Sequence, residues 1–121
     1  MRLAGSPISN AGRVEVFYLG YWGTVDNWGW DLNAAHVVCR QLGYSASLSF
    51  GYNNQFGSST GLEWFRNLRC FGNETNLGEC IKDLYGYPSS GSEAATALCE
   101  VPYEAGDLST FWTHAGLETF S

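Results

Sequence analysis

The sequence predicts a single α+β domain, built from short strands around one main helix and stapled by disulfides. Three observations support this prediction. The chain has 121 residues, which is about the length of one domain. Residues 12–43 have the pattern of a hairpin followed by a capped helix. The chain also contains four cysteines and no C-x-x-C pair, which favours disulfides over a metal site.

The first predicted element is a hairpin. Residues 13–18 (RVEVFY) alternate polar and apolar side chains, as a half-buried strand does. Leu19 and Gly20 form the predicted turn. A two-residue type I′ turn needs positive φ at its first residue, where asparagine is more common. Leu19 is therefore unusual at this position, and we expect its side chain to be exposed.

The second predicted element is a helix that Asp31 caps and Gly43 ends. Helical spacing predicts one core-facing stripe, made of Leu32, Ala35, Cys39 and Leu42. His36 follows a residue of this stripe. We interpret it as a surface or packed residue rather than as a catalytic base.

The rest of the chain has weaker signals. Residues 45–61 are rich in Ser, Gly and Asn and predict a long loop, with aromatic residues at Phe50, Tyr52 and Phe56. Residues 101–121 form a C-terminal tail, and residues 108–114 within it have strand-like composition. Tails are ordered only where something holds them, so we expect a docking strand or a linker. The tail could dock on its own domain or on a neighbouring chain.

Composition excludes several functions. The net charge is −6, the pI is near 4.6 and there is one lysine, which disfavours binding to nucleic acid or anionic membranes. No apolar run approaches the roughly 20 residues of a membrane span, and residues 1–5 lack the apolar segment of a signal peptide. No nucleophile, metalloprotease or phosphate-loop motif occurs. We therefore predict no enzyme activity and no cofactor.

The cysteines predict an oxidising compartment. An even number of cysteines in a small chain, together with the sequon Asn73-Glu74-Thr75, favours secretion and a glycan on Asn73. Residue spacing alone leaves three disulfide pairings open. The four cysteines are Cys39, Cys70, Cys80 and Cys99.

Four motifs carry a resemblance to a known family. They are the 12–43 stretch, WFRNLRC at 64–70, GNETNLGEC at 72–80 and SEAATALC at 92–99. Together they resemble the scavenger receptor cysteine-rich domain, an extracellular binding module, over residues 1–100. The resemblance implies a small curved antiparallel sheet that cradles the helix, with long loops and the pairings Cys39–Cys99 and Cys70–Cys80. It also places Trp22, Trp30 and Trp64 at the usual core aromatic positions.

One disulfide of the family is missing. Family members usually read W-G-T-V-C-D-D-G-W, whereas residues 22–30 here read WGTVDNWGW. Asp26 replaces one cysteine, and the position of its usual partner is Ser89. Both members are absent together, so no reactive thiol remains. We expect packing or an Asp26–Ser89 hydrogen bond to replace the bridge.

The cation site of many family members is also altered. Its positions correspond to Asn27, Trp28, Arg66 and Glu93, of which only Glu93 keeps a carboxylate. Hard cations need several oxygen ligands, so we expect no metal at this degenerate cation site. The arginine could lie near Glu93 as a fixed cation, or the two could be separate solvated charges.

Aromatic residues are abundant, with five Trp, seven Tyr and seven Phe. They could enlarge a core that has lost a disulfide, or they could form a contact surface. Candidate interface residues are Leu19, Tyr21, Trp28, Phe111 and Trp112. The sequence therefore predicts a secreted, noncatalytic module that binds a protein or glycan ligand. The alternative is a structural subunit of an extracellular homopolymer, joined through its aromatic face and its tail.

Overall fold

The computed structural model describes residues 1–51, 61–88 and 94–101. The expectations for Tyr52, Phe56, Ser89, Glu93 and the tail with Phe111 and Trp112 lie outside the described residues. The elements are β1 (Arg2–Ala4), β2 (Ala11–Tyr18), β3 (Tyr21–Val25), α1 (Leu32–Gln41), β4 (Ala46–Gly51), β5 (Leu62–Arg69), the 3₁₀ helix η1 (Leu77–Glu79), β6 (Ile81–Pro88) and β7 (Thr96–Glu100).

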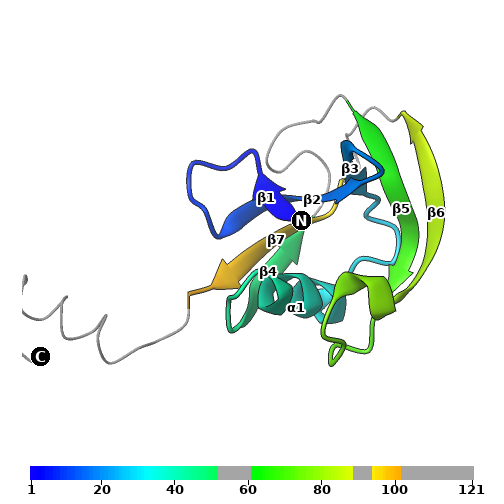
Figure 1. The fold of residues 1–121 in the computed structure, drawn as a ribbon. Helices are drawn as coiled ribbons and strands as arrows, with labels where there is room; N and C mark the ends of the chain where they lie inside the picture. The colour runs from blue at the N-terminus through cyan, green and yellow to red at the C-terminus, as the bar shows by residue number, and fades with distance from the viewer. Residues whose placement is uncertain (52–60, 89–93, 102–121) are drawn as a thin grey trace, which may run out of the picture.

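The strands form one curved sheet with α1 packed against one end of it, as Figure 1 shows. The strand order is β4-β7-β2-β3-β5-β6, and β1 pairs with β2. The α+β class with a single main helix is confirmed. The sheet is mixed rather than purely antiparallel, because β3 and β5 run parallel. A parallel pair needs a crossover connection, and α1 and β4 lie between these two strands in the chain.

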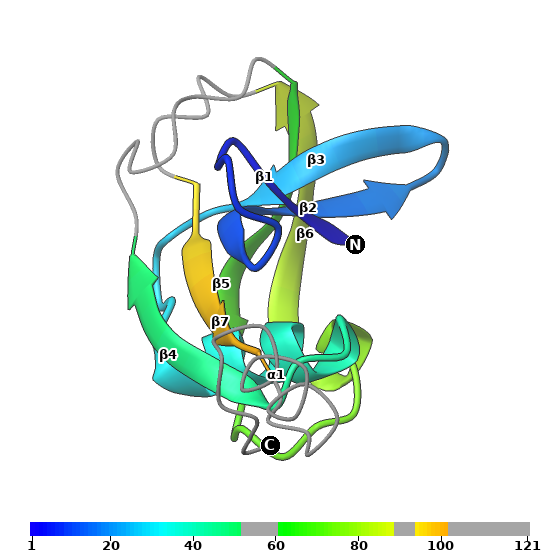
Figure 2. The ribbon, with the colours of Figure 1, turned by 90° about the vertical axis from the view of Figure 1, so that its left-hand side faces the viewer.

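The β2–β3 hairpin projects from the body of the domain (Figure 2). Leu19 has φ 51° and Gly20 has φ 88°, as a type I′ turn requires, and Leu19 is 72% exposed. The simple alternation of β2 does not hold, since Glu15 is buried and Phe17 is exposed. Ion pairs with Arg2 and Arg13, at 2.8 and 3.3 Å, offset the cost of burying the Glu15 carboxylate.

Helix α1 begins and ends as predicted. The Asp31 carboxylate accepts a hydrogen bond from the Ala34 N–H, and Gly43 follows the last turn with φ 98°. Leu32 was expected in the core but is exposed. The packed face starts two residues later and is wider than the predicted stripe; its members are Ala34, Ala35, Val37, Val38 and Cys39.

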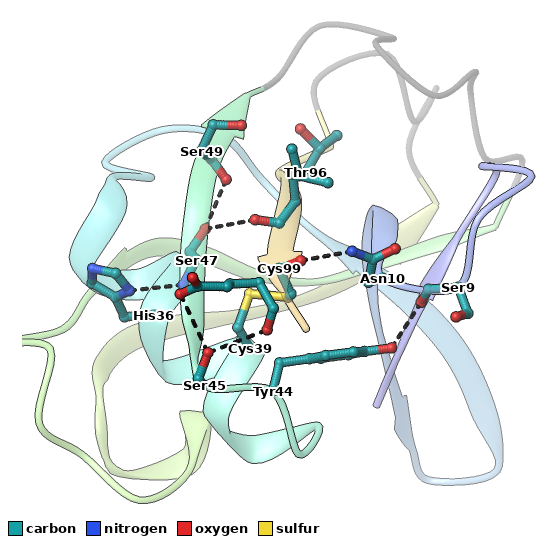
Figure 3. Close-up of a disulfide and its surroundings, with 12 residues drawn as sticks. Ser9, Asn10, His36, Cys39, Tyr44, Ser45, Ser47, Ser49, Thr96 and Cys99 are labelled. Atoms are coloured by element: carbon teal, nitrogen blue, oxygen red, sulfur yellow. Dashed lines mark hydrogen bonds between the residues drawn. A yellow bond between two sulfur atoms is a disulfide. The ribbon is translucent and has the colours of Figure 1, made fainter. Parts of the chain in front are cut away.

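The prediction of a loop over residues 45–61 is wrong for residues 46–51, which form β4. This strand pairs with β7, and its polar residues are satisfied locally. His36 Nδ1 accepts from the Ser47 N–H at 2.9 Å, and the Ser47 hydroxyl donates to the Ser49 carbonyl at 2.7 Å (Figure 3). Ser-rich composition therefore does not exclude an edge strand when a bulge and a side chain complete its hydrogen bonds.

Two disulfides and two tryptophans hold the core. Cys39–Cys99 joins α1 to β7 within the core (Figure 3), and Cys70–Cys80 closes the loop between β5 and β6. Trp30 and Trp64 are buried, and their indole N–H groups donate to the Thr96 and Tyr21 carbonyls. Trp22 was expected in the core, but it is 36% exposed. Instead it packs on Phe17 and lies beneath the guanidinium of Arg2 at 3.9 Å.

Candidate functional site

Two positions of the expected degenerate cation site lie in a polar cleft. These positions, Trp28 and Arg66, line a cleft of about 410 Å³ together with Asp26, Asn67 and Asp83. Glu93 lies outside the described residues. The bulge of β5 brings Arg66 opposite Asp83 of β6, and the turn after β3 brings Trp28 to the same cleft.

Arg66 is paired with Glu63, a partner that the sequence analysis did not predict. Its Nε donates to the carboxylate of Glu63, which is only 3% exposed. This bond is the main reason why the pKa of Arg66 is raised. The guanidinium also stacks over the Tyr85 ring at 3.6 Å. No sequence motif marks this pairing, because a bulge is needed for residues three apart on a strand to meet in this way.

Asp26, where the resemblance to the family implies a cysteine, is 8% exposed. Its backbone forms an isolated antiparallel bridge with Ala94, and its N–H donates to the Phe65 carbonyl at 2.9 Å. Its carboxylate accepts from the Trp28 N–H at 3.1 Å. Backbone pairing therefore connects the residue after β3 to the start of segment 94–101. The Asp26 carboxylate holds the turn that carries Trp28.

One group of potential metal ligands occurs in residues 1–51, 61–88 and 94–101. It consists of Cys70, Glu74 and Cys80, whose ligand atoms lie within 4.8 Å of one another. Both cysteines form a disulfide, so they offer no thiolate to a metal.

The sequon lies in the loop that this disulfide closes, and Asn73 is exposed. The carboxylate of Glu74 accepts hydrogen bonds from the N–H groups of Phe71 and Gly72, both at 2.9 Å. The bond from Phe71 is the largest cause of the lowered pKa of Glu74. The Glu74 carboxylate therefore links two backbone N–H groups of the loop beside the sequon.

An apolar surface, here called the hairpin face, covers the projecting β2–β3 hairpin. Residues 16–24 (VFYLGYWGT) contain no Asp, Glu, Lys, Arg or His. Five large side chains of this stretch are at least a third exposed: Phe17, Tyr18, Leu19, Tyr21 and Trp22. Exposed apolar patches of this kind mark contact surfaces more often than isolated hydrophobic residues do.

The candidate interface residues do not all lie together. Leu19 and Tyr21 share the tip of the hairpin face. Trp28 is 68% exposed, but it follows the opposite end of β3 and belongs to the polar cleft. Tyr21 begins β3, whereas Trp28 follows the far end of that strand. Their closeness in the sequence therefore does not bring them to the same surface.

A groove of about 500 Å³ lies beside the hairpin face and shares Phe17 and Tyr18 with it. It is predominantly apolar, and Lys82 supplies its only ionisable side chain apart from tyrosine. Its lining residues are Met1, Val16, Phe17, Tyr18, Gln41, Phe65, Leu77, Gly78, Lys82 and Leu84. Sequence analysis missed this groove because it combines residues from β2, β5, β6, η1 and the end of α1.

Comparison with known proteins identifies a family. The sequence pattern of the family "Scavenger receptor cysteine-rich domain" matches residues 4–100. The chain is 40% identical over 100 residues to macrophage scavenger receptor types I and II of Mus musculus, covering 82% of this chain and 22% of that protein. It is 44% identical over 87 residues to lysyl oxidase homolog 2 of Homo sapiens, covering 71% of this chain and 11% of that protein. The chain thus spans less than a quarter of these relatives.

Two solved structures share the fold. The third SRCR domain of murine neurotrypsin has a TM-score of 0.72 at 36% identity, covering 84% of this chain and 96% of that one. The dimeric form of the SRCR domain of mouse MARCO has a TM-score of 0.68 at 37% identity, covering 75% and 87%. No helix in the described part of the chain is long and apolar enough to cross a membrane.

Proposed function

This chain belongs to the scavenger receptor cysteine-rich family, and from that premise we propose that it is an extracellular, noncatalytic module that binds a protein ligand through its hairpin face. The observation that carries the proposal is the exposure of five large apolar side chains within the uncharged stretch 16–24 of the hairpin. Chains with intact disulfides belong to oxidising compartments, which supports an extracellular location.

The hairpin face is suited to binding because it is preorganised. Backbone pairing fixes Phe17 opposite Trp22, and the two rings pack at 5.2 Å between their centroids. A rigid face loses little conformational entropy on association. Burying one such side chain contributes roughly 1.5–3 kcal/mol, so two or three of them can anchor a protein contact.

A noncatalytic role is supported by how the polar groups are used. The ring Nδ1 of His36 accepts a backbone hydrogen bond from Ser47, and Arg66 is paired with Glu63. In the described structure both side chains have a structural partner. The homopolymer remains the second hypothesis, and no contact among the described residues favours it.

The test is binding of the full chain to panels of extracellular protein domains and of glycans. A double variant, Leu19→Asn with Tyr21→Thr, removes two apolar side chains from the tip. It preserves the fold because asparagine tolerates positive φ and threonine suits a strand. Trp28→Ser is the matched control, since it removes an equally exposed aromatic side chain from the polar cleft.

We expect the double variant to bind its protein ligand at least tenfold more weakly and the control to bind normally. The proposal fails if ligands are lost only in Trp28→Ser, because the polar cleft is then the binding site. It also fails if every ligand found is a glycan. Sedimentation of the unliganded chain distinguishes the homopolymer hypothesis from ligand binding. A homopolymer subunit associates without any ligand, whereas a ligand-binding module does not need to.

A further inference from the structure

The groove beside the hairpin face has a distinctive charge pattern. The Nζ of Lys82 donates to the carbonyls of Gly78 and Cys80 at 2.9 and 3.3 Å and lies 5.4 Å from the centre of the Phe65 ring. Within residues 1–51, 61–88 and 94–101 it forms no ion pair with a carboxylate. A positive charge on an apolar wall favours an occupant that is apolar and negatively charged.

The C-terminal segment of this chain has the complementary composition. Residues 103–120 contain no lysine or arginine. The acidic residues of the segment are Glu104, Asp107 and Glu118, and its aromatic residues are Tyr103, Phe111, Trp112 and Phe120. The segment is therefore acidic and aromatic, whereas the groove is basic and apolar.

The last described strand ends close to the groove. The N–H of Ser45 donates to the carbonyl of Glu100 at 3.3 Å, at the end of β7. Ser45 comes four residues after Gln41, which lines the groove and accepts a hydrogen bond from the N–H of Leu77 at 2.8 Å. Four residues span at most about 14 Å, whereas the ten residues from 101 to 111 can span about 33 Å. The chain after residue 101 is therefore long enough to reach the groove.

We propose that the groove receives the acidic aromatic segment 103–120 of the same chain. Attachment at residue 101 gives this segment an effective concentration in the millimolar range, which favours its own groove over that of another copy. Apolar side chains of the segment cover Phe65 and Leu84, and its carboxylates face Lys82. The docked segment covers the Phe17 and Tyr18 part of the hairpin face and leaves Leu19 and Tyr21 free. This inference goes beyond the proposed function and is tested without any ligand.

The experiment is hydrogen–deuterium exchange of the full chain, followed in peptides from residues 103–120. We expect amide exchange at least tenfold slower than in an unstructured peptide of the same sequence. Leu84→Asp and Lys82→Glu each remove this protection by at least fivefold. Ile81→Asp is the matched control, because Ile81 is exposed on the same strand and does not line the groove.

A reciprocal variant guards against a groove substitution that disturbs the fold. Phe111→Ser with Trp112→Ser changes only the segment, and it should speed exchange in residues 77–84 while the exchange of β7 stays unchanged. Random-coil exchange of residues 103–120 in the unmodified chain overturns the proposal. So does protection that survives both Leu84→Asp and Lys82→Glu, which means docking elsewhere, or protection that grows with protein concentration, which means docking on a neighbouring copy.

Discussion

The guanidinium of Arg66 stacks over the ring of Tyr85 at 3.6 Å while its Nε donates to buried Glu63. The pair brings a permanent side-chain cation to one position of the expected degenerate cation site. A guanidinium stays protonated and has no acceptor atom, so it repels a divalent cation rather than binding it. The polar cleft is therefore arranged around an internal cation.

Calcium should not stabilise this chain. A ligand at a hundred times its Kd adds about 2.7 kcal/mol, which would raise the Tm of a domain of this size by roughly 10 °C. We expect no change of Tm between chelator and millimolar Ca²⁺ in thermal unfolding. A clear rise that Glu93→Gln abolishes would contradict this prediction, because Glu93 is the one carboxylate left at the degenerate cation site.

The two disulfides should differ in their effect on stability. Cys39 and Cys99 are 60 residues apart, and Cys70 and Cys80 are 10 apart. Chain entropy predicts a loss of about 4 kcal/mol when the first pair is replaced by alanine and about 3 kcal/mol for the second. Urea unfolding of the two double variants measures these losses. Non-reducing peptide mapping of the unmodified chain provides the control, and a Cys39–Cys70 link would refute the pairing.

The stability of the 70–80 loop should depend on pH through Glu74. Its folded-state pKa is lowered, above all by the hydrogen bond from the Phe71 N–H, so its contribution is fully present above the unfolded pKa of about 4.3. The contribution disappears as the pH falls through the lower, folded-state pKa. Glu74→Gln should therefore destabilise the chain in urea unfolding at pH 7 and have no effect in strong acid. An equal loss at both pH values would indicate a steric cause instead.

Asn73 should carry a glycan when the chain is secreted from eukaryotic cells. The residue is exposed, and it lies in the loop that the Cys70–Cys80 disulfide closes, outside the stretch 16–24 that forms the hairpin face. Mass spectrometry of secreted material should show a glycan that Thr75→Ala removes. Ligand binding should not change in that variant. Unmodified Asn73 in the parent chain would count against the prediction.

Several features of the fold follow from local chemistry and were predictable from the sequence. Asp31 and Gly43 mark the ends of α1 because capping and positive φ depend on the residue itself. Leu19 is exposed because a two-residue turn points its side chain away from the sheet. Residue spacing left three disulfide connectivities open, and the resemblance to the family implied the one that the structure has.

Other features depend on residues far apart in the chain. Residues 46–51 form a strand only because β7 and His36 supply their hydrogen-bond partners. Trp22 is exposed, although Trp64 is buried, because the hairpin extends beyond the body of the sheet. Leu32 is exposed because packing covers α1 only from Ala34 onward. The strand at 46–51 and the exposure of Trp22 and Leu32 thus depend on which neighbouring elements contact them.

The sequence by itself therefore determined the family, the helix and the hairpin turn, and it predicts the loss of the metal-ligand set at Asn27, Trp28 and Arg66. These conclusions rest on residue identities and on interactions within a few positions. Only the tertiary structure decided that Glu63 holds Arg66, that Trp28 lies apart from Leu19 and Tyr21, and that an apolar groove surrounds Lys82. These arrangements join residues from several elements, among them the bulged strand β5 and its parallel neighbour β3, and no local pattern encodes the bulge or the pairing.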